Sequence, residues 1–176
     1  VELTTALVTL LLYMNYWLNW ELIATIALFY TLIVLSLIDL KYKAVPDYLL
    51  IVAVILAILV GDLMYILIFA GGFALLELVI TFYIQNVKAK ITKNKELETQ
   101  SALGEGDIPI AGVIGGLLGL HLGISAIFLA TLLGLLLSTY NLLSKKEIET
   151  PFIPFLSLGL FITFISGFNI FSWLLR

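Results

Sequence analysis

Long apolar runs, separated by short polar interruptions, make up most of the chain. A helix that crosses the hydrocarbon core of a bilayer needs about 20 apolar residues. Seven segments fit this pattern, at residues 3–18, 22–40, 48–61, 64–85, 108–120, 122–143 and 152–175. The third and fifth are short, so they would lie steeply or sit partly in the interface. The sequence lacks the alternation of apolar and polar positions that would indicate a transmembrane β-barrel. The pattern therefore predicts an all-α transmembrane bundle of about seven helices, forming a single domain over residues 1–176.

The composition supports lipid as the solvent for much of this chain. Of its 176 residues, 62% are hydrophobic and 12% are charged, with a mean hydropathy of +1.15. A soluble domain is nearer ~45–50% apolar. The net charge of −3 comes with no basic arm or stripe, so we expect no nucleic-acid partner.

Two scarce residue types limit the chemistry. Cysteine is absent and His121 is the single histidine. Disulfides, thiolate zinc sites and cysteine nucleophiles are thereby excluded, and a site with two histidine ligands is excluded as well. We expect neither a metal nor an organic cofactor, so any chemistry must use carboxylates, hydroxyls or lysines.

The basic residues lie in alternate loops. Eight of the nine follow the second, fourth and sixth apolar segments, namely Lys41, Lys43, Lys88, Lys90, Lys93, Lys95, Lys145 and Lys146. Cytoplasmic loops carry an excess of Lys and Arg. This distribution predicts a cytoplasmic N-terminus and an external C-terminus, where Arg176 lies.

Closely spaced glycines follow the fifth segment. Gly112, Gly115, Gly116, Gly119 and Gly123 give small residues at spacings of three to four. Such spacing allows helix backbones to approach closely in a membrane. We therefore expect this segment to pack centrally.

Three acidic side chains lie at membrane depth, Asp39, Glu77 and Asp107. Burying such a group costs roughly 2.5–3.5 kcal/mol on insertion scales, which makes each a candidate for function. Asp39 closes the second segment and Asp107 opens the fifth, so both are expected at cytoplasmic ends. Two aspartates at one depth on separate helices could share a proton and activate a water molecule.

Each acid also has a simpler interpretation. Asp107 before Pro109 resembles a helix N-cap with proline in the first turn. Asp39 is harder to explain in this way, since an acid at a helix C-terminus opposes the macrodipole. Glu77 is better read as a polar packing residue that hydrogen-bonds a neighbouring helix.

Several motifs, in order along the chain, resemble the type IV prepilin peptidase family of GxGD intramembrane aspartyl proteases. Gly104, Glu105, Gly106 and Asp107 match its GxGD motif, and Asp39 followed by Pro46 and Asp47 resembles its other catalytic segment. The opening of residues 151–159, PFIPFLSLG, resembles its final helix, and GGFALLELVITFYI resembles the helix before the GxGD loop.

The resemblance implies a protease that removes short basic leaders from type IV prepilins or type II secretion pseudopilins. The site would face the cytoplasm from the inner membrane, with Asp39 and Asp107 as the catalytic pair. Gly104 and Gly106 would leave room for a substrate strand. Glu105 would either attract the basic leader or be a solvated loop acid, and Pro46 with Asp47 would shape the site.

Two features depart from the family's usual pattern. A lysine is common two residues after the GxGD aspartate, whereas this chain has Pro109. Many bacterial members also carry an N-terminal methyltransferase domain with cysteines. The chain begins where that domain would end, so we expect a protease core without it.

Two alternatives stay open at this point. One is an archaeal preflagellin peptidase or presenilin-like peptidase, which shares the GxGD motif. The other is a component of a proton-coupled transporter, in which Asp39, Glu77 and Asp107 form a relay. The transporter predicts acids spread through the membrane depth, whereas the protease predicts two acids close together at one face.

Overall fold

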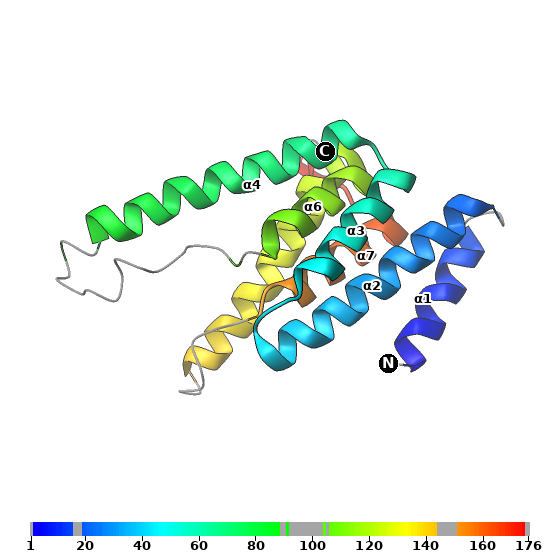
Figure 1. The fold of residues 1–176 in the computed structure, drawn as a ribbon, viewed down its shortest axis with the longest axis horizontal. Helices are drawn as coiled ribbons and strands as arrows, with labels where there is room; N and C mark the ends of the chain where they lie inside the picture. Colours follow the sequence, from blue (N-terminus) through cyan, green and yellow to red (C-terminus); the bar gives the residue numbers. More distant parts are fainter. Residues whose placement is uncertain are drawn as a thin grey trace.

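The fold is an all-α bundle, as the apolar runs predict (Figure 1). The computed structural model describes residues 2–15, 19–88, 91, 104, 106–143 and 151–174. Its helices are α1 (Glu2–Asn15), α2 (Trp20–Tyr42), α3 (Asp47–Val60), α4 (Leu63–Tyr83), the π-helix η1 (Ile84–Lys88), α6 (Asp107–Leu143), α7 (Ile153–Ser166) and α8 (Ile170–Leu174). No strand occurs among the described residues.

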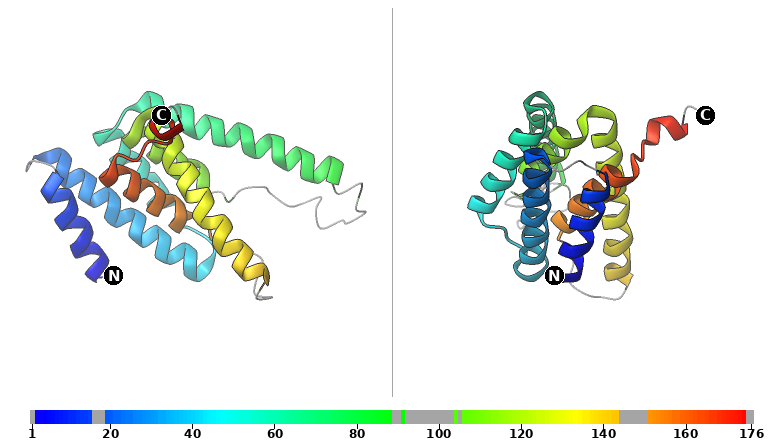
Figure 2. Two further views of the ribbon diagram at one scale, coloured as in Figure 1. Left: turned by 180° about the vertical axis from the view of Figure 1, so that it is seen from behind. Right: turned by 90° about the vertical axis from the view of Figure 1, so that its right-hand side faces the viewer.

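Helix α6 contains both the fifth and the sixth predicted segments, divided at Gly119. This residue has φ 68° and ψ −168°, an extended conformation with positive φ that is essentially confined to glycine. A Cβ at Gly106, before the first half, would touch Ile153, and one at Gly134, in the second half, would touch Phe152. The start of the first half and a late part of the second half thus lie against adjacent residues at the start of α7, so the halves run in opposite directions (Figure 2). The prediction of two segments is therefore correct, although their boundary is a break within one run of helix.

The last predicted helix, 152–175, is interrupted, which corrects the prediction of one continuous segment. Helix α7 ends at Ser166, and Gly167 follows with φ 63°, closing the helix as a left-handed C-cap. After Asn169 the chain resumes as the short α8. The Ile170 N–H donates to the Ser125 hydroxyl at 3.0 Å, which ties α8 to the second half of α6.

The glycine-rich first half of α6 lies at the centre of the bundle, as expected. Residues Ile110 to Ile114 are buried. A Cβ at Gly112 would meet the carbonyl of Ile66 in α4 at 3.2 Å, and one at Gly115 or Gly116 would overlap α4 side chains. These small positions let α4 and α6 pack closely.

Within the described part of the chain, three helices are long and apolar enough to cross a bilayer: α2, α4 with η1, and α6 over Asp107–Asn141. Helices α1, α3 and α7 are apolar but shorter. Since α6 is broken at Gly119, its first half extends only about 18 Å, at 1.5 Å per residue. That half resembles the short, interior segment that the sequence predicts.

The bundle has two distinct ends. Helix α1 begins at the end where α2 and the second half of α6 finish, whereas α8 lies at the opposite end (Figures 1 and 2). Helices α2 and α4 begin at this opposite end, and a polar side chain caps each of them. Asn19 accepts from the Leu22 N–H at 3.0 Å and Asp62 accepts from the Met64 N–H at 2.8 Å.

Candidate active site

Asp39 continues the buried stripe of α2 at its last turn. The stripe runs along one face of the helix, through Leu22, Thr25, Leu28, Phe29, Leu32, Leu35 and Asp39. Every third or fourth residue therefore faces the other helices. Asp39 is only 7% exposed, so this acid occupies a position where the pattern calls for an apolar side chain.

The carboxylate of Asp39 receives a hydrogen bond from another helix. The N–H of Ile153, the first residue of α7, donates to it over 3.2 Å. The first N–H groups of a helix have no partner within it and form the positive end of its dipole. The N-cap residue of α7, Phe152, makes no side-chain cap hydrogen bond. Asp39 from α2 thus takes the role of the cap, and this hydrogen bond links the last turn of α2 to the start of α7.

Asp107 is the first residue of α6 and is 6% exposed. Its carboxylate accepts from the Gly104 N–H at 3.1 Å, while its own N–H donates to the Gly104 carbonyl at 3.0 Å. The bond therefore comes from the chain upstream of the helix. This differs from the N-cap interpretation, in which the side chain would accept from the helix itself.

Gly106, next to Asp107, fits between the α2–α3 connection and the start of α7. A Cβ there would lie 2.6 Å from Cγ2 of Val45 and 2.9 Å from Cδ1 of Ile153. The side chain of Ile153 therefore lies against Gly106, the neighbour of Asp107. The N–H of the same residue donates a hydrogen bond to Asp39. The carboxylates of Asp107 and Asp39 interact electrostatically. The structure thus brings the two predicted acids to one end of the bundle, around the start of α7.

Glu77 is a third acid near this place. It lies on α4, is partly buried, and also interacts electrostatically with Asp107. The sequence favours a packing role for it. Because it is close enough to Asp107 to interact with it, Glu77 belongs to the surroundings of the candidate site.

The remaining predicted site residues differ in how they are placed. Pro46 is the N-cap residue of α3, and its carbonyl accepts from the Leu49 N–H at 3.1 Å. Asp47 is the first residue of α3, and it is exposed. Val45, just before them, is the residue that lies against Gly106. Glu105 lies outside the described residues.

Ile153 is the residue that sequence reasoning missed. Ile153 contributes its backbone N–H, which donates to Asp39, so the type of its side chain gives no indication of this role in the sequence. The available signal was the pair of prolines around it, since Pro151 and Pro154 favour a helix start there. That Asp39 would meet this start follows only from tertiary packing over 114 residues of sequence.

Buried carboxylates can bind cations as well as carry protons. Among the described residues, no group of three or more His, Cys, Asp or Glu side chains is arranged to hold a metal ion. What the site offers is two carboxylates from different helices, each held by a backbone N–H and shielded from solvent.

The comparison with known proteins gives one match. The model of the type IV leader peptidase family covers residues 26–139, more than half of the chain. The matched range includes both Asp39 and Asp107, and it ends before α7. Neither the curated proteins nor the solved structures include a match. With its apolar helices and this family match, the chain is a membrane protease that belongs to the type IV leader peptidase family.

Proposed function

We propose that the chain is an aspartic endopeptidase that removes the basic leader from type IV prepilins or type II secretion pseudopilins. Asp39 and Asp107 are the catalytic pair, and Gly104, Gly106, Pro46 and Asp47 shape the site. Membership of the type IV leader peptidase family supports a protease with a protein substrate.

One observation carries the proposal. Two aspartates from separate helices are each less than a tenth exposed, and both lie around the first turn of α7. Burying two carboxylates side by side costs stability, because each charge loses water and repels the other. Such an arrangement persists where the groups share protons for chemistry.

The proposed reaction follows the general scheme of an aspartate pair. One carboxylate takes a proton from a water molecule, which attacks the scissile carbonyl carbon. The protonated partner donates to the carbonyl oxygen, giving a tetrahedral diol. Proton transfer to the amide nitrogen then breaks the C–N bond and releases an acid and an amine, with both aspartates restored. No cofactor takes part in this scheme.

The distribution of acids favours a protease over a proton-coupled transporter. A relay would need acids along the membrane depth. Instead, Asp107 interacts electrostatically with Asp39, and both lie around the start of α7. The same end of α2 carries Lys41 and Lys43, so the positive-inside rule supports a site facing the cytoplasm from the inner membrane.

Mass spectrometry tests the proposal directly. A leader-bearing prepilin or pseudopilin is incubated with the purified chain in detergent or lipid discs. We expect a mass loss equal to the leader, with cleavage at a single bond. An intact precursor in the presence of folded chain would contradict the proposal.

A further inference from the structure

The second half of α4, together with η1, carries a polar stripe that has no role in the reaction above. The stripe consists of Glu77, Thr81 and Gln85, which recur every four residues and so lie on one side of the helix. All three are partly shielded from solvent, whereas the apolar residues Leu78 and Phe82 beside them are 65% and 62% exposed. Glu77 is also the one charged residue in the sequence of α4. Polar groups along a membrane helix are costly, which makes the stripe a candidate for function.

The polar stripe continues the face of α4 that packs on α6. Ile66 and Phe69 are the buried residues of this helix. Steps of four residues from Phe69 lead through the half-buried Phe73 to Glu77. Past its contact with α6, the far end of α4 projects beyond the other helices (Figures 1 and 2), and little of this helix is buried. The polar stripe therefore lies on the side of α4 that faces the bundle, while its other sides face lipid.

The register of α4 against α6 brings Glu77 next to the candidate site. A Cβ at Gly116 of α6 would touch Ile66. One at Gly112, four residues nearer the start of α6, would also meet Ala70, four residues farther along α4. The two helices are thus antiparallel, and the same register carries Glu77 about one turn, or about 6 Å of rise, past the first residue of α6. That residue is the aspartate of the candidate site, and its carboxylate interacts electrostatically with Glu77.

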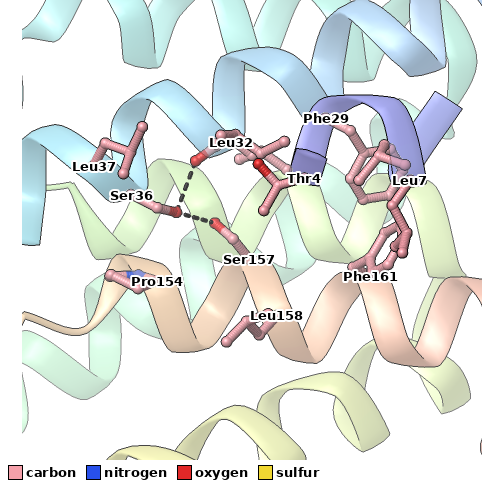
Figure 3. Close-up of a pocket in the computed structure, with 12 residues that line it drawn as sticks. Thr4, Leu7, Phe29, Leu32, Ser36, Leu37, Pro154, Ser157, Leu158 and Phe161 are labelled. Atoms are coloured by element: carbon pink, nitrogen blue, oxygen red, sulfur yellow. Dashed lines mark hydrogen bonds between the residues drawn. The ribbon is translucent and has the colours of Figure 1, made fainter. Parts of the chain in front are cut away.

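The groove between α1, α2 and α7 differs from the polar stripe in its chemistry. It has a volume of about 360 Å³, and none of the residues that line it is charged. The Ser36 hydroxyl in its wall donates to the Leu32 carbonyl at 2.7 Å and lies 3.1 Å from the Ser157 hydroxyl (Figure 3). A basic peptide that leaves water needs carboxylates or other polar partners in its place. The polar stripe supplies such partners, whereas the groove does not.

We infer that the polar stripe binds the basic leader of the substrate, and that Glu77 pairs with a positively charged leader side chain. The inference rests on the proposed function, because it takes the leader to be basic and Asp107 to be at the point of cleavage. Hydrogen bonds between a carboxylate and a lysine or arginine are roughly twice as strong as neutral ones. Thr81 and Gln85 can donate to and accept from the leader backbone. The stripe rises about 12 Å, which matches three or four residues of extended chain. Glu77 is thus a residue that determines specificity.

Exchange of charges between enzyme and leader tests the inference. Each lysine of a prepilin leader is replaced in turn by glutamine or by glutamate, and kcat/KM is measured. At one position the unmodified chain should prefer lysine over glutamine by about tenfold or more. Glu77→Gln should abolish this preference, mainly through KM, and Glu77→Lys should restore cleavage of the leader with glutamate there. Glu21→Gln and Glu21→Lys are the controls, since Glu21 is exposed at the far end of α2, and they should keep the preference.

An unchanged lysine preference in Glu77→Gln would overturn the inference. So would an equal loss on lysine and glutamine leaders, because it would show that Glu77 acts through Asp107 or through the fold. This comparison stands even where Glu77→Lys does not fold. Binding gives a readout without cleavage: a fluorescent leader peptide with its lysines is titrated onto the chain in discs of zwitterionic lipid. Glu77→Gln should weaken this binding about tenfold, and equal binding by the two chains would overturn the inference. If the unmodified chain cleaves no leader, the proposed function fails, while the inference is still decided by binding.

Discussion

At the scale of single residues, the site depends on backbone groups more than on side chains. Asp39 and Asp107 each accept one hydrogen bond from a backbone N–H, of Ile153 and of Gly104. The sequence identifies both acids, since an aspartate in an apolar run is conspicuous. It does not identify their donors, because every residue except proline carries an N–H group.

Gly106→Ala should impair catalysis more than stability. The added Cβ would crowd Val45 and Ile153, and Ile153 is the residue whose N–H holds Asp39. The nearest atoms are side-chain ends, so they can move, but a shift of about 1 Å at a reacting group can cost on the order of 100-fold in rate. We expect a loss in kcat of that order, measured on a leader-bearing substrate.

Gly72→Ala is the matched control for this change. It lies on α4, and a Cβ there would meet nothing within 4 Å. Alanine in a helix is favoured over glycine by about 0.5–1 kcal/mol, so this variant should keep full activity. Equal activity of Gly106→Ala and Gly72→Ala would show that the fit around Ile153 has no bearing on catalysis.

At the scale of elements, the sequence predicts apolar helices well and their interruptions less well. Gly119 divides α6 close to the predicted boundary, because a glycine cluster and His121 mark the place. Gly167 ends α7 within a long apolar and aromatic run, and the prediction of one continuous segment followed that run rather than the local signal of Ser166, Gly167 and Asn169. After the break, the Ile170 N–H donates to Ser125 of α6 and the Phe171 N–H donates to the Asn169 side chain. The contact with α6 depends on tertiary packing, which local pattern does not reveal.

Two buried hydroxyls in this region should respond in opposite ways to removal. Thr163 on α7 is fully buried, and its hydroxyl has no hydrogen-bond partner among the residues that the structure describes. Ser125 is also fully buried, but its hydroxyl donates to the His121 carbonyl and accepts from Ile170. An unpaired buried polar group lowers stability, whereas a paired one contributes to it.

Thr163→Val should therefore raise the free energy of unfolding by up to about 1 kcal/mol, and with it the unfolding temperature. Ser125→Ala should lower it, since interhelical hydrogen bonds in membranes contribute about 0.6 kcal/mol on average and the Ile170 N–H loses its acceptor. Thermal unfolding in detergent, followed by circular dichroism, measures both. The same direction of change in the two variants would contradict the hydrogen bonding described for α7 and α8.

At the scale of the whole molecule, the positions of lysines predict which end of the bundle faces the cytoplasm. The absence of cysteine from the chain allows single cysteines to report sidedness. Lys41 and Glu21 are exposed and lie near opposite ends of α2. Lys93 and Lys146, which also carry this prediction, lie outside the described residues.

Labelling with an impermeant thiol reagent in intact cells should modify Glu21→Cys and spare Lys41→Cys. Permeabilised cells should allow both to react. The physical reason is that Lys and Arg are retained on the cytoplasmic side during insertion. Labelling of Lys41→Cys from outside in intact cells would place the Asp39 end of the bundle on the wrong face and contradict the proposed approach of the substrate.

The assembly of the site is a property of the whole bundle, which explains why the sequence predicts its members and not its construction. The apolar runs and the loop charges indicate that Asp39 closes one helix and Asp107 opens another at a similar depth. It does not specify that α7 begins between them, nor that α1 and α7 leave a groove beside α2. These features depend on how helices distant in sequence pack, which no local pattern encodes.

The central claim is that Asp39 and Asp107 act as one catalytic unit. It is tested most directly by measuring leader cleavage with Asp39→Asn, Asp107→Asn and the double variant. Asp62→Asn is the control, since asparagine can also cap α4 at the opposite end. Groups that act as a unit are non-additive, so each single change should lower kcat by about 10⁴-fold or more, and the double change by no more than that. Substantial cleavage by either folded single variant would contradict the account.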